Sequence, residues 1–128
     1  MVGYAEAFKT LGYYISSPIS DVSSEKEDGV VIAIMRHELR YENKRTIFDT
    51  RQIPDWEKMR MSLPGNTRRR AHLSKAVDKF GGLVDVILYD KPVKGNGDAE
   101  IANSPNSRWV VTYFDEITGH HRVELQPN

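Results

Sequence analysis

Residues 64–80 read PGNTRRRAHLSKAVDKF, and this stretch has the strongest helical pattern in the chain. It opens on a proline–glycine pair, with Asn66 or Thr67 as the expected capping residue. Apolar residues recur at helical spacing and define one face: Leu73, Ala76, Val77 and Phe80. Two glycines follow, and glycine favours the left-handed conformation that ends many helices. We therefore predict a helix over residues 64–80.

The same stretch carries the densest positive charge of the sequence. Three successive arginines, Arg68, Arg69 and Arg70, fall near the start of the helix, where the helix dipole disfavours cations. An anionic partner would relieve this placement. Because successive helical residues point in different directions, at most two of the three can serve one ligand. Steps of three and four residues give a better single stripe, formed by Arg68, His72, Lys75 and Lys79.

Charge is distributed unevenly along the 128 residues, although the formal net charge is zero. Residues 36–79 hold twelve basic side chains against six acidic ones, and both flanks are acidic. The middle third is therefore predicted to form a basic surface, to which Arg40, Arg45 and Arg51 also contribute. The alternative is that the acidic ends fold back and pair with these cations, which leaves an ordinary solvated face.

The remaining pattern predicts one α+β domain spanning residues 1–128. Further helices are expected over 4–11 and 53–63, and strands over 30–35, 45–51, 83–89, 109–114 and 120–125. A turn near Asn43 should join residues 30–41 to 45–51 as a hairpin, and Gly119 should lie in a second hairpin loop. We expect a largely antiparallel sheet of about five strands, with two or three helices packed on one side. Residues 21–28 are predicted as a loop, and residues 90–107 as a long flexible one.

Several classes of protein and site are excluded or disfavoured by composition. The chain has no cysteine, so disulfides, thiolate metal sites and cysteine nucleophiles are excluded. No apolar run is long enough to span a bilayer, and the first residues do not match a secretory signal. We therefore expect an intracellular, cytoplasmic protein without a membrane partner.

No motif that names a chemistry is found. His37 and Glu38 lack the second histidine of the zinc-protease pattern, and His120 and His121 should point to opposite faces of a strand. Asp85 lacks the acidic-x-Lys partner that metal-dependent nucleases place on a following strand. The sequence contains no GxSxG elbow and no complete phosphate-binding loop. We predict no catalytic residue, no metal site and no cofactor.

These observations favour a nucleic-acid-binding domain that contacts phosphates through a basic helix. The predicted contact residues are Arg68, Arg69, Arg70, His72, Lys75 and Lys79, extended by Arg40, Arg45 and Arg51. The alternative is a non-enzymatic protein-interaction or accessory module. Its mixed-charge surface would then serve a protein partner, with contacts from residues 90–107 or from the terminal hairpin.

Overall fold

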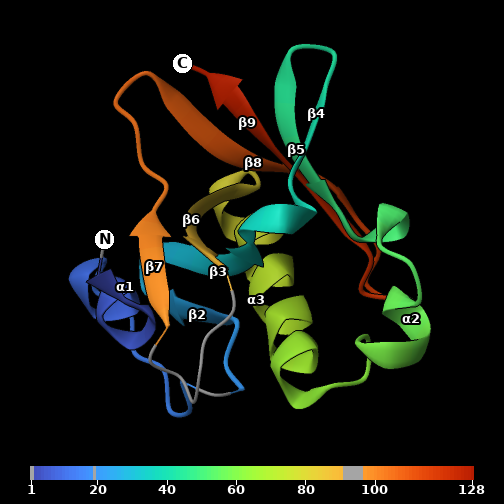
Figure 1. Cartoon of the computed structure of the whole chain (residues 1–128), viewed down its shortest axis with the longest axis horizontal. Helices are drawn as coiled ribbons and strands as arrows, with labels where there is room; N and C mark the ends of the chain where they lie inside the picture. Colours follow the sequence, from blue (N-terminus) through green and yellow to red (C-terminus); the bar gives the residue numbers. More distant parts are fainter. Residues whose placement is uncertain (1, 19, 91–96) are drawn as a thin grey trace.

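The computed structural model describes residues 2–18, 20–90 and 97–128. In chain order, the elements are β1 (Val2–Gly3), α1 (Tyr4–Thr10), β2 (Ser23–Lys26), β3 (Gly29–Met35), the 3-10 helix η1 (Arg36–Glu38), β4 (Arg40–Glu42), β5 (Arg45–Asp49), the 3-10 helix η2 (Thr50–Gln52), α2 (Trp56–Met59), α3 (Pro64–Phe80), β6 (Leu83–Tyr89), β7 (Asp98–Ile101), β8 (Ser107–Phe114) and β9 (His121–Pro127). Figure 1 shows α3 standing beside the central strands, with the β4–β5 hairpin above α2.

Helix α3 confirms the predicted helix over residues 64–80 and its termination by glycine. It starts at Pro64 and ends at Phe80, and the following Gly81 caps it with a left-handed φ of 61°. The predicted cap is wrong: the N-cap position is Leu63, while the Asn66 amide donates to the carbonyl of Arg60. Proline at the first helical position needs no hydrogen-bond partner for its nitrogen, so the helix starts earlier than a polar cap would place it.

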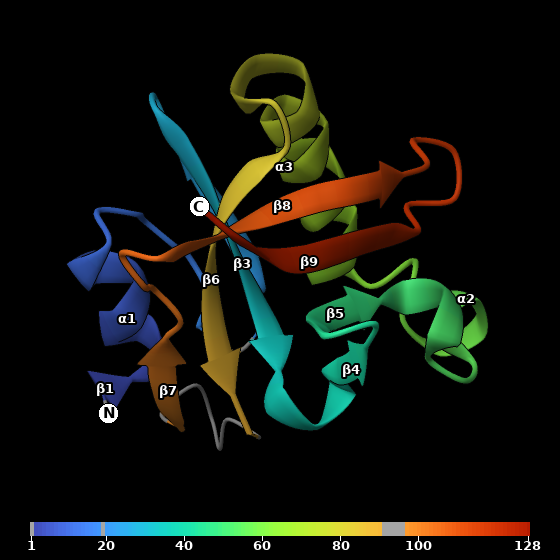
Figure 2. The ribbon, with the colours of Figure 1, turned by 90° about the horizontal axis from the view of Figure 1, so that it is seen from above.

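Strand β3 is a central strand with both faces buried, as its continuous apolar sequence predicts. It lies beside β6 in parallel register, from Val31 opposite Asp85 to Met35 opposite Tyr89. The connection between the two strands contains the β4–β5 hairpin and α2, and it ends with α3. Figure 2 shows both strands pointing in the same direction. The predicted long hairpin of residues 30–41 with 45–51 is therefore wrong.

The predicted turn itself is present. Asn43 and Lys44 both have positive φ, and they join β4 to β5 in a short antiparallel hairpin. The chain leaves β3 through η1 before this hairpin begins. Residues 30–35 pair elsewhere because a strand that is apolar on both faces needs cover on both faces, which a two-stranded hairpin does not provide.

Within the described residues, the sheet has nine strands rather than about five, and all its pairings there except that of β3 with β6 are antiparallel. Strand β6 connects two parts of the sheet. One part contains β2, β3, β7 and β1, and the other contains β8, β9, β5 and β4. Two of the strands that were not predicted are short and polar: β2 lies in the predicted loop 21–28, and β7 lies in the predicted loop 90–107. Residues 91–96 of the latter loop are outside the described residues.

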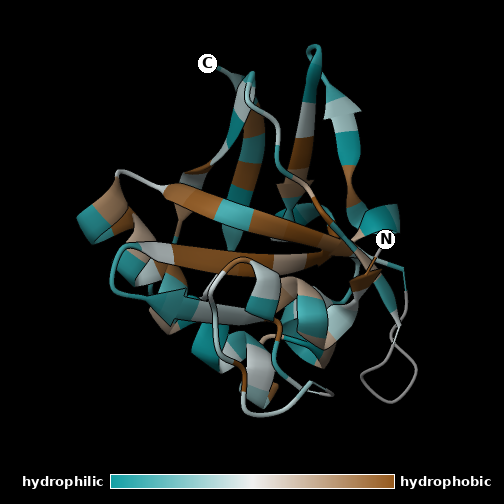
Figure 3. Ribbon diagram, turned by 90° about the vertical axis from the view of Figure 1, so that its left-hand side faces the viewer, coloured by the Kyte–Doolittle hydropathy of each residue, from teal (hydrophilic) through white to brown (hydrophobic). Residues whose placement is uncertain are grey.

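Helices cover both faces of the central strands, so the prediction that they pack on one side is wrong. Val30, Ile32 and Ile34 of β3 belong to the same buried cluster as Leu73 of α3. Val31 and Ala33 belong to a second cluster, with Tyr4, Ala7 and Phe8 of α1. The alternation of side chains along a strand places the two clusters on opposite faces. In Figure 3 the hydrophobic colour accordingly gathers on the strands in the middle of the molecule.

None of the helices in the described residues has the length and apolar character needed to cross a membrane.

Candidate nucleic-acid interface

The predicted contact residues separate into two groups on opposite faces of the sheet. The helical group lies on α3, which packs against the face that carries Phe48 and Val123. Successive side chains of β5 point to opposite faces of the sheet. Phe48 faces α3, so Arg45, Ile47 and Asp49 point to the face away from α3. One continuous basic patch over residues 36–79 is therefore not formed.

Arg69 is a correction to the predicted interface, because it belongs to the core. It is 2% exposed, and its Nη2 donates to the main-chain carbonyls of Val22 and Ala33. It precedes Leu73 by four residues, so helical periodicity places both on the buried face of α3. A buried guanidinium is not available to a phosphate at the surface.

Most other cations of α3 are engaged by neighbouring groups. Arg68 pairs with the buried Asp21. The His72 Nδ1 lies 2.7 Å from the Ser23 hydroxyl, and the Lys75 ammonium donates to the carbonyl of Lys26 at 2.8 Å. Acidic partners come from the N-terminal flank: Asp21 for Arg68, and Glu25, 3.8 Å from the Lys75 ammonium. At Arg68 and Lys75, the acidic N-terminal flank thus supplies ion-pair partners of the kind that the alternative expects.

Arg70 and Lys79 lie at other positions of the helix surface. Arg70 donates to the carbonyl of Ile117 in the loop between β8 and β9, at 3.0 Å. Lys79 is exposed in the last turn of α3, near the cap formed by Gly81. Arg68 and Lys79 are the exposed members of the predicted stripe of Arg68, His72, Lys75 and Lys79.

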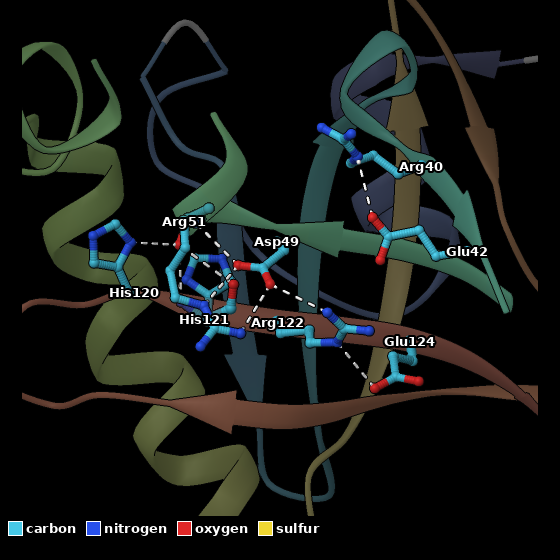
Figure 4. Close-up of polar contacts among 9 residues, drawn as sticks. Arg40, Glu42, Asp49, Arg51, His120, His121, Arg122 and Glu124 are labelled. Atoms are coloured by element: carbon cyan, nitrogen blue, oxygen red, sulfur yellow. Dashed lines mark hydrogen bonds and ion pairs between the residues drawn. The ribbon is translucent and has the colours of Figure 1, made fainter. Parts of the chain in front are cut away.

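A second group of arginines gathers on the sheet face that points away from α3. We define this arginine face by Arg40, Arg45, Arg51, Arg108 and Arg122, with the carboxylates Glu42, Asp49 and Glu124 among them. Strand register brings the set together: Arg122 lies opposite Asp49, and Glu124 lies between Ile47 and Val110. Figure 4 labels Arg40, Glu42, Asp49, Arg51, Arg122 and Glu124 of this face, which come from β4, β5, η2 and β9.

Asp49 is the centre of the arginine face. It is 3% exposed and accepts from the Arg51 Nε at 3.0 Å, from the Arg51 Nη2 at 2.9 Å and from the Arg122 Nη1 at 3.4 Å. Burial alone would raise the pKa of Asp49, but the hydrogen bonds and charges of the two arginines bring it below its usual value. Asp49 is therefore an anion that fixes two guanidinium groups.

The other carboxylates hold the arginines less tightly. Glu124 accepts a hydrogen bond from the Arg122 Nε at 3.2 Å. A carboxylate oxygen of Glu42 lies 3.5 Å from the Arg40 Nε, and both side chains of this ion pair are partly exposed. Burial would raise the pKa of Glu124, and hydrogen bonds from Thr112 and Arg122 lower it. With five arginines against three carboxylates, the arginine face keeps a positive excess in a chain of zero net charge.

Aromatic and polar groups complete the arginine face. The Arg51 guanidinium lies over the ring of Tyr113, 4.0 Å from its centroid, and Tyr113 is 37% exposed. A β-bulge between Val111 and Tyr113 places two residues of β8 opposite Arg122, which turns the tyrosine toward this face. A hollow of about 240 Å³ adjoins the face, and its lining includes Arg40, Asp49 and His37.

A hydroxyl–imidazole–carboxylate chain lies next to the start of β9. The Thr50 hydroxyl is 2.9 Å from the His120 Nδ1, and the His120 Nε2 is 2.6 Å from a Glu57 oxygen. Thr50 is fully buried, and its hydroxyl oxygen also accepts from the backbone N–H of His121. A nucleophile must be reachable by its substrate, and the buried Thr50 hydroxyl is not. The contacts therefore serve to tie η2 and α2 to β9.

Sequence reasoning missed Arg108, Arg122 and Tyr113, which lie on the arginine face. Arg122 and Glu124 alternate with apolar residues in 121–125, so their common face was readable from the sequence. Their place beside Arg45 and Asp49 depends on the pairing of β5 with β9, which joins residues more than seventy positions apart. No protein-family model, no curated protein and no solved structure matches this chain.

Proposed function

We propose that the protein binds nucleic acid through the arginine face, with arginines contacting phosphates and Tyr113 offering a ring for a base. The observation that carries the proposal is the convergence of five arginines from four strands and η2 on one sheet face. Guanidinium groups bind phosphate through paired N–H donors, and sheet faces with exposed aromatic rings are suited to single strands.

Three arginines are the expected phosphate contacts. Arg51 and Arg122 form ion pairs with the buried Asp49. Arg40 instead forms a partly exposed ion pair with Glu42. Arg40 and Arg108 are exposed, and Arg45 is half-buried on the same face. These three side chains are free to move toward a ligand without leaving a buried carboxylate unpaired.

Binding is measured by fluorescence anisotropy with a labelled 20-nucleotide strand of DNA, the same strand of RNA and the DNA duplex. Replacement of Arg40, Arg45 and Arg108 by alanine should weaken binding at least tenfold. It should also reduce the slope of log affinity against log salt, by about 0.7 for each lost single-strand phosphate contact. The matched control replaces Arg70 and Lys79 of α3, and it should bind like the wild type.

Two results would oppose the proposal. Binding to none of the three nucleic acids at low salt would remove it, and the protein-interaction module would then be the better hypothesis. Loss of binding in the α3 control, with the arginine-face variant unchanged, would return the interface to the helix.

A further inference from the structure

The hollow of about 240 Å³ beside the arginine face shares residues with that face. Arg40 lines the hollow and belongs to the arginine face, and Asp49, at the centre of the face, is also part of the lining. The rest of the wall comes from His37 and Glu38 of η1, Gln52 of η2, and the following Ile53 and Pro54. Because Arg40 is exposed, a phosphate bound to it lies at the rim of the hollow.

The charges of the lining favour a phosphate at the rim and an uncharged group inside. Glu38 and Asp49 line the hollow as members of ion pairs, with side chains that are only 9% and 2% exposed. The arginines paired with them are not part of the lining among the described residues. The Arg40 side chain is 53% exposed. Since like charges repel, the interior disfavours a phosphate, whereas an uncharged ring can enter.

The remaining surface of the hollow suits a flat ring with polar edges. Ile53 is half-buried and Pro54 is exposed, and together they supply an apolar surface. The Gln52 amide and the His37 imidazole are exposed, and both can donate and accept hydrogen bonds. The volume is below the roughly 300 Å³ at which small-molecule sites usually begin, which leaves room for about one ring system. A nucleobase combines such apolar faces with hydrogen-bonding edges.

A second contact for a base lies close to the hollow. Asp49 accepts from Arg51, and the Arg51 guanidinium lies over the ring of Tyr113. One ion pair therefore connects the wall of the hollow with the exposed tyrosine. In a duplex the bases are stacked and paired, so only an unpaired base can enter a hollow of this kind.

We propose that this hollow receives one unpaired nucleobase of a bound strand, with the phosphate of the same nucleotide on Arg40. The ring lies against Ile53 and Pro54, and its edge meets Gln52 and His37. The proposal rests on the proposed nucleic-acid function and adds to it a preference for single strands over a duplex. A mononucleotide probes it separately, because it needs the hollow and Arg40 but not the rest of the arginine face.

The test is a titration of the ¹⁵N-labelled protein with adenosine 5′-monophosphate (AMP), followed by amide chemical shifts. We expect saturable shifts at His37, Gln52 and Ile53. Ribose 5-phosphate has the phosphate without the base, and it should bind about tenfold more weakly. Ile53→Trp fills the hollow and should weaken AMP by about the same factor. Met59→Trp adds the same ring at an exposed position of α2, and this control should bind AMP as the wild type does.

A second variant keeps the test decisive if Ile53→Trp does not fold. Arg40→Gln changes an exposed side chain and should weaken AMP by about tenfold, because it removes a charge-assisted contact to the phosphate. Adenosine lacks that phosphate, so it should bind equally to Arg40→Gln and to the wild type. Absence of saturable shifts, equal binding of ribose 5-phosphate and AMP, or unchanged AMP affinity in either folded variant would overturn the proposal.

The 20-nucleotide strand separates this failure from a failure of the nucleic-acid function. If the strand binds and the variant of Arg40, Arg45 and Arg108 weakens it, while AMP gives no saturable shifts, the arginine face stands and the base hollow does not. If no strand binds, the nucleic-acid function fails, and the placement of a strand's base in the hollow fails with it. A duplex that binds as tightly as the single strand would also contradict the proposal.

Discussion

At the scale of single residues, Asp49 shows how the arginine face is held in place. Its carboxylate is almost completely buried, and it gains hydrogen bonds from Arg51 and Arg122 that partly repay its loss of water. Because its pKa is lowered in the folded protein, its contribution to stability is present above about pH 4 and is lost as the pH falls through the lowered pKa.

We predict that Asp49→Asn lowers the free energy of unfolding by about 2 kcal/mol at pH 7, because it leaves two guanidinium groups without their shared anion. Urea denaturation followed by tryptophan fluorescence measures the change. Glu42→Gln removes the partly exposed partner of Arg40 and is the matched control, with an expected loss below about 0.5 kcal/mol. Equal losses in the two variants would contradict the central role of Asp49.

His121 is a buried neutral imidazole. Its Nδ1 lies 2.9 Å from the carbonyl of Gly119, so this nitrogen carries the proton and donates it. Burial, together with the nearby charge of Arg69, lowers the pKa of His121 to about 3, from a usual 6.5. Between these values the unfolded chain binds a proton that the folded protein does not, so stability falls as the pH is lowered below about 6.5.

This titration predicts a loss of about 2 kcal/mol in the free energy of unfolding between pH 7 and pH 5. His121→Asn keeps a donor for Gly119 and removes the titration, so its stability should be lower at pH 7 but should change less toward pH 5. His72, whose pKa burial also lowers, accounts for a remaining slope. Urea unfolding at both pH values tests this, with exposed His37→Asn as control. If the free energy of unfolding of His121→Asn falls as much between pH 7 and pH 5 as that of the wild type, His121 is not the group responsible.

At the scale of elements, α3 was predictable in its bounds but not in the environment of its arginines. The glycines after Phe80 and the spacing of Leu73 and Ala76 sufficed to place the helix. The same spacing, continued four residues toward the N-terminus, reaches Arg69, and this was the available signal for its burial. Residue type argued against it, since arginine is seldom fully buried without a partner. The partners, main-chain carbonyls of Val22 and Ala33, come from the remote β2–β3 region.

The end of α3 offers a clean test of backbone strain. Gly81 has a φ of 61°, and a Cβ added there meets nothing within 4 Å. Gly81→Ala should therefore lower the free energy of unfolding by about 1 kcal/mol through conformation alone. Gly3→Ala is the control, since its added Cβ also meets nothing within 4 Å and its φ is −69°. Chemical denaturation compares the two, and no loss in Gly81→Ala would contradict the left-handed cap.

At the scale of the whole molecule, the α+β class and the mainly antiparallel sheet followed from the pattern of strands and turns, while the topology did not. Nothing local to Val30–Ile34 specifies that the strand pairs in parallel with residues 54 positions later instead of with residues 45–51. Short strands such as Ser23–Lys26 and Asp98–Ile101 have polar sequences, and they form because neighbouring strands offer free edges.

The sequence also predicted that residues 36–79 are basic. It did not predict that their cations divide between two faces of the sheet. The cations of residues 36–79 are split by the sheet: those of α3 are largely engaged by acids and carbonyls, and those of β4, β5 and η2 join Arg108 and Arg122. Such a division depends on which face of β5 packs against α3, and this is fixed only by the pairing of β5 with β9.

The most direct test of the proposed nucleic-acid interface is an NMR titration of the arginine Nε–Hε signals with an unlabelled 20-nucleotide single strand. We predict that the signals of Arg45 and Arg108 shift with nucleotide concentration and return as salt is added, while those of Arg69 and Arg70 stay in place. Shifts confined to Arg68 and Arg70 of α3, with Arg45 and Arg108 unmoved, would contradict the arginine face as the binding surface.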